Sequence, residues 1–252
     1  MRCRFPFVAL LLSVAAGAAL MPPAGHAQEA LIAVAANFAP VATRLKTSFE
    51  EDSPHRITVA SGSTGKHYAQ ISNGAPFDAF LAADDVHPRR LAEQKLGIDD
   101  SRFTYALGRI GIWIPGSVAG PDQVQDLLDL HRIAVANPAL APYGAAAMSV
   151  LDRFDLTRTL KGRLVLGENV AQAYAMVASG SAQGGIIAWS HIVAGGREGE
   201  SLLIPAGWHP PIRQDALLLR HGRDNPAARA FLDFLRTDPA RAVIRAHGYL
   251  TD

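Results

Sequence analysis

Cysteine is almost absent from this sequence, since its 252 residues contain only Cys3. Cys3 lies in a segment that we interpret below as cleaved, so the remaining chain has no thiol group. This absence excludes disulfide bonds, thiolate chemistry and cysteine-based metal sites from the functional part of the protein. It also argues against a lipid-modified cysteine at the mature N-terminus, because Cys3 lies far from the expected cleavage point.

Long apolar runs are missing except at the N-terminus, where Phe7–Leu20 is almost unbroken. Its 14 residues are too few for the roughly 20 that a membrane-spanning helix requires. Arg2 and Arg4 precede this run, and small residues follow it, which is the order of a secretory signal. We therefore expect residues 1–27 to be a signal peptide that is cleaved after about Ala27, and the mature protein to reside in the periplasm.

A charge excess of either sign is missing too. Residues 1–27 hold two of the 24 basic residues and none of the 23 acidic ones, so residues 28–252 carry 22 basic and 23 acidic residues and a net charge of −1. Without a basic field the chain lacks the means to hold a polyanion, and we expect no nucleic-acid partner. Hydrophobic residues make up 49% of the sequence and charged residues 19%, which is typical of a globular protein.

Catalytic and metal-binding motifs are also missing. There is no Gly-x-Ser-x-Gly elbow, and the histidines form no His-x-x-x-His pair. The segment around Lys66 resembles a phosphate loop only superficially, because Ala60 and His67 stand where that motif requires glycine and serine or threonine. We expect Lys66 to be a solvated helix residue, and the carboxylates of Asp84 and Asp85 to cap a helix. No catalysis, no metal ligand and no cofactor are expected.

Short apolar runs alternate with polar turns and helical periods along the whole mature chain. Strands that alternate with helices in this way are typical of an α/β fold with mainly parallel sheets. The expected strands are Leu31–Ala36, Arg56–Ala60, Asp78–Ala83, Phe103–Ile114, Arg132–Ala136, Leu164–Leu166, Gly185–Ile187 and Ala216–Leu219.

No linker or repeat divides the chain, although 225 residues are enough for two lobes of about a hundred each. We infer two lobes between which the chain crosses more than once, near Leu107–Ile112 and near Leu203–Gly207. The first lobe is then discontinuous and comprises residues 28–108 and 205–252. Residues 109–204 form the second lobe, with a ligand cleft between the two.

Four strand-to-helix junctions share one chemical character, which is a supply of neutral hydrogen-bond donors at a helix start. Helix N-termini have up to four unpaired N–H groups and a partial positive charge, so they attract anions. Each junction alone is explained by ordinary helix capping. Together they lie at the carboxyl ends of strands, where ligands gather in open α/β sheets, and so predict an anion site. The junctions are Ala36-Asn37, Gly62-Ser63-Thr64-Gly65, Ala141-Pro142-Tyr143-Gly144 and Asn169-Val170-Ala171.

The donors at these junctions also indicate which anion fits. Apart from Lys66, no basic residue is placed to neutralise the ligand. A fully deprotonated oxyanion accepts hydrogen bonds at every oxygen, whereas a protonated phosphate leaves its O–H without an acceptor at a cost of about 1–3 kcal/mol. Sulfate is unprotonated as well, so only the size of the cavity separates it from a larger tetrahedral oxyanion.

A set of short motifs runs through the mature chain: Val34-Ala35-Ala36-Asn37-Phe38, Ser61-Gly62-Ser63-Thr64-Gly65, Gly74-Ala75-Pro76-Phe77-Asp78, Ala83-Asp84, Asn137-Pro138, Ala141-Pro142-Tyr143-Gly144 and Gly248-Tyr249. Together they resemble the molybdate-binding periplasmic proteins of ABC importers. The resemblance implies a two-lobed periplasmic binding protein fold of type II, with lobes that close like a hinge. It implies molybdate or tungstate as the ligand, a membrane permease and an ATPase as partners, and a monomeric protein.

The resemblance also implies which residues bind the anion, with Val170 contributing its backbone. One style of pocket in this family has a serine at the first junction and a tyrosine after a later strand, where this chain has Asn37 and Ala188. The chain is similar to the second style, in which the asparagine and a loop tyrosine supply donors. A shift of one residue in register would exchange the roles of Ser63 and Thr64, so either hydroxyl could contact the anion. The expected binding residues are Ala36, Asn37, Ser63, Thr64, Tyr143 and Val170.

Three other functions remain open from the sequence. The same cleft could hold sulfate or another small oxyanion. A periplasmic hydrolase of small anionic esters requires a nucleophile and a base at the cleft, and the sequence shows no convincing pair. A ligand-binding sensor that regulates a membrane partner would share the fold and the site.

Overall fold

The computed structural model describes residues 27–251, so nearly all of the expected signal peptide lies outside the described residues. Within this range, ten strands form two five-stranded sheets. In order of pairing, the strands of the first sheet are β2 (Arg56–Gly62), β1 (Glu29–Ala35), β3 (Ala79–Leu81), β10 (Ile212–Leu218) and β4 (Phe103–Gly108). Those of the second sheet are β7 (Leu164–Gly167), β6 (Ile133–Ala136), β8 (Gly184–Ala188), β5 (Ile110–Trp113) and β9 (Ser201–Leu203).

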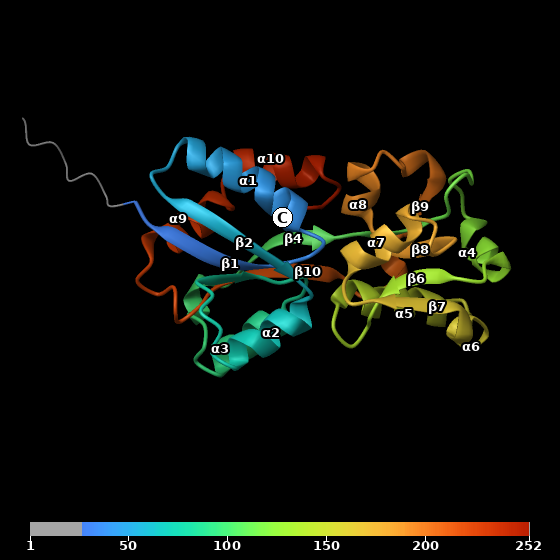
Figure 1. The fold of residues 1–252 in the computed structure, drawn as a ribbon, viewed down its shortest axis with the longest axis horizontal. Coiled ribbons are helices and arrows are strands. Elements are labelled where there is room, and N and C mark those ends of the chain that lie inside the picture. The colour runs from blue at the N-terminus through green and yellow to red at the C-terminus, as the bar shows by residue number, and fades with distance from the viewer. Residues whose placement is uncertain (1–26, 252) are drawn as a thin grey trace, which may run out of the picture.

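Helices cover both faces of each sheet and complete two lobes, which lie side by side along the long axis (Figure 1). In the first lobe, one apolar cluster joins one face of the sheet to three helices and another joins the opposite face to two. The helices of the first lobe are α1 (Ala39–Glu51), α9 (Pro226–Phe234) and α10 (Asp238–Ala246) on one face, and α2 (Thr64–Ser72) and α3 (Val86–Glu93) on the other. Those of the second lobe are α4 (Gln123–Asp126), α5 (Pro142–Arg153), α6 (Thr157–Leu160), α7 (Val170–Ala178) and α8 (Trp189–Ala194).

The expected two-lobed α/β fold is confirmed, but the sheets are mixed rather than mainly parallel. In each sheet, two of the four strand pairings are antiparallel. The antiparallel pairings all involve β10 or β5, the strands with which the chain enters a sheet from the other lobe. The single strand expected over Phe103–Ile114 is therefore two strands in different sheets, β4 and β5, and the short β9 was not predicted.

The strand pairs at the centre of each lobe determine where the four junctions lie. In the first sheet β1 and β2 are parallel neighbours, with Ala35 opposite Gly62 at their carboxyl ends. In the second sheet β6 and β7 are parallel neighbours, with Ala136 opposite Gly167. Because parallel neighbours end at the same edge of a sheet, each lobe presents two of the predicted junctions next to each other.

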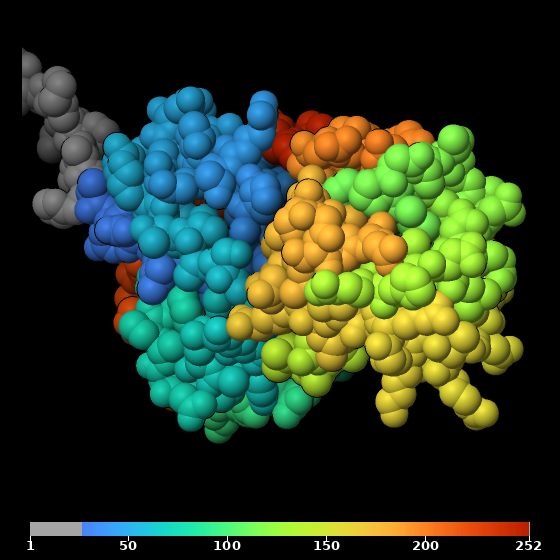
Figure 2. All heavy atoms as spheres, turned by 45° about the vertical axis from the view of Figure 1, so that its right-hand side comes forward, coloured from blue at the N-terminus to red at the C-terminus, as the bar shows by residue number. Residues whose placement is uncertain are grey.

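The two lobes are in contact, so the structure shows the cleft in a closed state. The backbone N–H of Gly65 in α2 donates to the carbonyl of Leu140 in the second lobe at 2.9 Å. The two lobes also touch across the face shown in Figure 2. The chain passes between them at Arg109 and again between β9 and β10. Among the described residues, no helix has both the length and the apolar character needed to cross a bilayer.

Candidate functional site

The four junctions meet in one small cavity between the lobes, which we call the donor cavity. Its volume is about 10 Å³, close to the minimum that holds one water molecule. In this closed state it excludes larger organic molecules. All six residues expected to bind the anion line it. The full lining is Ala35, Ala36, Asn37, Gly62, Ser63, Thr64, Ala83, Ala141, Pro142, Tyr143, Asn169 and Val170.

Backbone N–H groups at the junctions supply donors to this cavity. Among residues 27–251, the N–H groups of Asn37, Tyr143 and Val170 have no hydrogen-bond acceptor, as expected at the start of a helix or in the turn before one. The N–H of Ala36 is different, because it donates to the carbonyl of Gly62 at 2.8 Å. Ala36 therefore lines the cavity without a free backbone donor, and the free donor of the first junction is Asn37.

The local sequence explains why α5 begins so close to the cavity. Pro142 occupies the first turn of the helix, where its missing N–H costs nothing. Gly144 follows two residues later, and a Cβ atom there would lie 2.2 Å from the carbonyl oxygen of Ala136. Because only glycine permits this close approach, the Ala-Pro-Tyr-Gly motif brings Tyr143 against the end of β6.

The two hydroxyls of the second junction have different surroundings. The Ser63 side chain is 2% exposed, and its hydroxyl has no hydrogen-bond partner among the described residues. The hydroxyl of Thr64, by contrast, accepts the N–H of Ala83 at 2.9 Å. A buried polar group without a partner is costly, so the Ser63 hydroxyl is available to a bound ligand. The hydroxyl is hydrogen-bonded to no basic side chain among the described residues.

The side chains of Asn37 and Tyr143 face a buried polar network at the back of the cavity. The Asn37 amide donates to the Gln214 side-chain oxygen at 2.7 Å and to the Tyr143 hydroxyl at 3.3 Å. The Tyr143 hydroxyl fits beside the crossing between the lobes only because position 108 is glycine. A Cβ atom on Gly108 would lie 2.4 Å from this hydroxyl. The sequence did not predict Gln214, which lies between Arg213 and Asp215 in β10 and so has no distinct signal in the sequence.

The electrostatics of the donor cavity come from dipoles rather than from charges. No acidic, basic or histidine side chain is among the residues that line it. Burial raises the pKa of Tyr143 well above that of a free tyrosine, so the hydroxyl stays protonated and able to donate. Among the described residues, no group of three or more histidine, cysteine, aspartate or glutamate side chains could hold a metal ion.

Lys66 lies beside the cavity and contacts the other lobe. Its ammonium group is 3.0 Å from a carboxylate oxygen of Glu168, the residue before the fourth junction. Both side chains are about half exposed, so the pair contributes little energy. Lys66 is an exposed residue of α2, as expected, and the closure of the lobes also brings it to a partner distant in the sequence.

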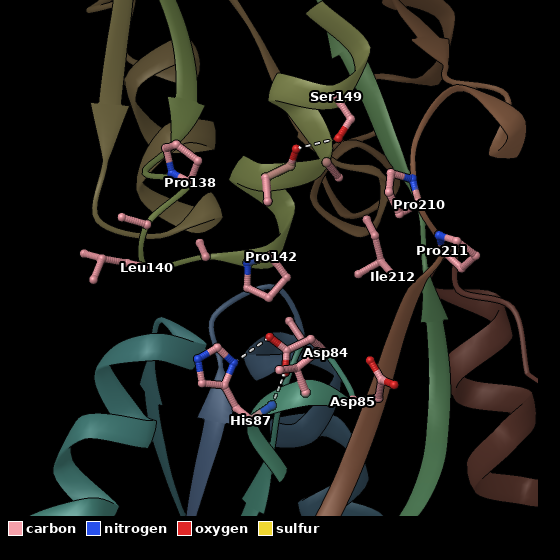
Figure 3. Close-up of a pocket in the computed structure, with 16 residues that line it drawn as sticks. Asp84, Asp85, His87, Pro138, Leu140, Pro142, Ser149, Pro210, Pro211 and Ile212 are labelled. Carbon is pink, nitrogen blue, oxygen red and sulfur yellow. Dashed lines mark hydrogen bonds and ion pairs between the residues drawn. The ribbon is translucent and has the colours of Figure 1, made fainter. Parts of the chain in front are cut away.

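A second and larger cavity adjoins the donor cavity, and we call it the proline groove (Figure 3). It has a volume of about 450 Å³ and shares Ala83, Ala141 and Pro142 with the donor cavity. Prolines supply no N–H groups, and the groove contains the carboxylates of Asp84 and Asp85. Asp84 accepts the backbone N–H of His87 at 3.0 Å, which agrees with its expected capping role. The groove therefore offers an anion few hydrogen-bond donors. Its prolines are Pro138, Pro142, Pro210 and Pro211.

Comparison with known proteins agrees with this geometry. The family described as bacterial extracellular solute-binding protein matches residues 30–250. The chain is 43% identical to the molybdate-binding protein ModA of Azotobacter vinelandii over 94% of this chain and 96% of that protein. It is 40% identical to ModA of Rhodobacter capsulatus, with 97% and 96% covered. The chain belongs to this solute-binding family, among its ModA-like members.

Solved structures give the same result for the fold. The periplasmic molybdate-binding protein of Azotobacter vinelandii superposes with a TM-score of 0.83 at 33% identity, over 88% of this chain and 99% of that chain. The sulfate-binding protein SubI of Mycobacterium tuberculosis superposes with a TM-score of 0.71 at 16% identity, over 89% and 86%. At that identity SubI shares only the fold. The ModA-like relatives are binding proteins, and this chain is a binding protein rather than an enzyme.

Proposed function

We propose that this protein binds molybdate in the donor cavity and delivers it to an ABC importer. The observation that carries the proposal is the 43% identity to a molybdate-binding protein over nearly the whole chain. The donor cavity supports it chemically. Free N–H groups from both lobes, together with the hydroxyl of Ser63, converge on this small space between the lobes.

The assignment of individual donors is part of this proposal. Asn37, Tyr143 and Val170 bind through their backbone N–H groups, and Ser63 binds through its hydroxyl. Thr64 contributes its backbone at the start of α2, since its hydroxyl already accepts a hydrogen bond. Ala36 shapes the wall, because its N–H is occupied. Neutral donors of this kind hold a doubly charged oxyanion when water is excluded.

Several finer features belong to the same proposal. The first lobe comprises residues 28–108 and 205–252, and the second comprises residues 109–204. The protein is exported to the periplasm, with cleavage after about Ala27, and acts as a monomer. It binds tungstate as well as molybdate, because the two ions have almost the same size and shape. A permease and an ATPase in the membrane accept the ligand from the closed form.

A thermal-shift series with the mature protein tests the ligand. Ligands raise the melting temperature by mass action, so the order of the shifts gives the order of affinities. We expect molybdate and tungstate to give large shifts, sulfate a smaller one and phosphate the smallest. A larger shift with sulfate than with molybdate would replace the proposal by a sulfate-binding function.

Two substitutions test the site by titration calorimetry. We expect Asn37→Ala and Tyr143→Phe each to weaken molybdate binding by about 1–3 kcal/mol, because each change removes side-chain hydrogen bonds that hold the backbone donors in place. Asn225→Ala is the matched control, because Asn225 caps α9 through its side chain and lies outside the cavity. Unchanged affinity in both site variants would overturn the role assigned to Asn37 and Tyr143.

A further inference from the structure

A buried network of five polar side chains lies behind the donor cavity and joins the two lobes. Three of its members come from the first lobe and two from the second, and all are buried. We call it the interlobe network. Because the anion cavity is also formed by both lobes, a bond in this network that crosses between the lobes links their relative position to the cavity. Its members are Asn37, Tyr143, Ser190, Gln214 and Tyr249.

Tyr249, near the C-terminus, holds the central position in this network. Its hydroxyl donates to the backbone carbonyl of Asn37 at 2.7 Å and is hydrogen-bonded to the Ser190 hydroxyl at 3.0 Å. Its ring packs edge-on against Phe38, with the ring centroids 5.5 Å apart. The position of the hydroxyl is therefore fixed both by packing and by hydrogen bonds. Bonds from Tyr249 reach the turn before α1 in its own lobe and the start of α8 in the other.

Asn37 is held at two points by these contacts. Its side-chain amide donates to Gln214 at 2.7 Å, and its carbonyl oxygen accepts from Tyr249. The hydroxyl of Ser190 in the second lobe lies 3.3 Å from this carbonyl, and its single proton serves either this contact or the one to Tyr249. The backbone N–H of Asn37 remains free to donate into the cavity. The hydrogen bonds to the side chain and the carbonyl of Asn37 fix the direction in which this N–H points. Ser190 can contribute to this restraint only while the lobes are together.

We infer that Tyr249, together with Ser190, is a positioning residue for oxyanion binding: it orients Asn37 in the closed form and slows release of the anion. The inference rests on the proposed function, because it concerns the same cavity. Bonds that form on closure stabilise the complex after encounter, so their loss changes the dissociation rate and leaves the association rate nearly unchanged. A purely structural role would lower the stability of the fold without this kinetic signature.

Stopped-flow measurement of molybdate association and dissociation tests the inference in Tyr249→Phe, Ser190→Ala and the double variant. Removing a hydrogen bond worth about 0.5–1.5 kcal/mol gives roughly three- to tenfold faster dissociation in Tyr249→Phe, with association within about twofold of wild type. We expect a smaller acceleration in Ser190→Ala. The double variant should fall short of the product of the single effects, because the two hydroxyls contact each other.

Tyr105→Phe is the matched control. Tyr105 is also a buried tyrosine, but its hydroxyl donates to the carbonyl of Ala82 at 2.9 Å and lies 3.3 Å from Gln214, both in the first lobe. It should lose stability like Tyr249→Phe and keep the wild-type dissociation rate. An unchanged rate in Tyr249→Phe, or an equal acceleration in the control, would overturn the inference.

Two further outcomes can be distinguished from each other: a Tyr249→Phe variant that does not fold, and a wild-type protein that does not bind molybdate. If Tyr249→Phe does not fold, Ser190→Ala decides alone, and a wild-type dissociation rate in that variant overturns the inference. If the wild-type protein does not bind molybdate, the proposed function fails instead. The same variants are then measured with whichever of tungstate and sulfate gives the larger thermal shift, and the same criteria apply.

Discussion

The donor cavity and the proline groove are neighbours between the same two lobes, yet their chemistry is opposite. They share three wall residues, but the groove has a volume of about 450 Å³ and the cavity about 10 Å³. Free N–H groups and the Ser63 hydroxyl line the smaller space. The larger one presents prolines and the carboxylates of Asp84 and Asp85 (Figure 3). Size alone would therefore select the wrong cavity for an anion.

The difference shows what makes an anion site in this fold. An oxyanion that leaves water must recover its hydrogen bonds from fixed donors, and an open groove with few donors cannot supply them. The cavity does so with parallel strand pairs that bring two helix starts from each lobe to one point. The groove lies beyond Pro142, where the backbone has no N–H to offer. Pro142 thus lies at the boundary between the donor cavity, which is rich in N–H groups, and the proline groove, which has few.

The largest effect on molybdate affinity is expected when a carboxylate, of the kind found in the proline groove, is placed in the donor cavity. In Ser63→Asp, a carboxylate replaces the unpartnered hydroxyl and opposes a bound dianion. We expect molybdate affinity to fall by at least about 100-fold, which corresponds to about 3 kcal/mol. Titration calorimetry measures this loss.

Ser149→Asp is the matched control for this charge, because Ser149 lines the proline groove. There the added carboxylate joins an acidic and solvated surface, so affinity should stay within about threefold of wild type. Equal losses in the two variants would show that the two spaces respond alike to charge and would remove the contrast between them.

The sequence predicted the donor cavity better than it predicted the sheets. Asn37, Ser63, Tyr143 and Val170 were predicted to share one site because strand ends and helix starts leave local signals in the chain, and all four line the donor cavity. The antiparallel pairings of β5 and β10 were missed, since they depend on which lobe the chain enters, and this leaves no local pattern. The hydrogen bond that occupies the Ala36 N–H was missed for the same reason.

The interlobe network was beyond sequence analysis for a further reason. Tyr249 and Asn37 are 212 residues apart in the chain, and neither gives a sign of the other. The motif Gly248-Tyr249 was noted only as part of a resemblance. Gln214 stands in a buried strand, where a polar residue requires a partner, but the sequence does not say which one. Closure of two lobes creates contacts that only the folded molecule reveals.

A smaller effect is expected when the groove loses one of its charges. In Asp84→Asn the side chain keeps an oxygen that can accept the N–H of His87, so the start of α3 should remain intact. One negative charge near the bound anion disappears, and molybdate affinity should rise by no more than about threefold at low salt. The gain should vanish at high salt. A loss of affinity would instead assign Asp84 a supporting role in binding.

The smallest effect is expected from pH, because the two tyrosines of the interlobe network resist ionisation. Burial raises the pKa of Tyr143 well above 10, and it raises that of Tyr249 from 10 to about 12. The neutral form is the one favoured in the folded protein. The stability that Tyr249 contributes is therefore complete below pH 10 and is lost as the pH rises toward 12.

Molybdate affinity should accordingly change by less than about twofold between pH 7 and pH 9.5, because no hydroxyl donor becomes an anion in that range. Calorimetric titration at several pH values checks this, and Tyr143→Phe should give a profile of the same shape at lower affinity. If affinity declined steadily above pH 8 in the wild type and not in Tyr143→Phe, the hydroxyl would be ionising within that range. Water would then have more access to the donor cavity than the burial of its residues indicates, as it has to the proline groove.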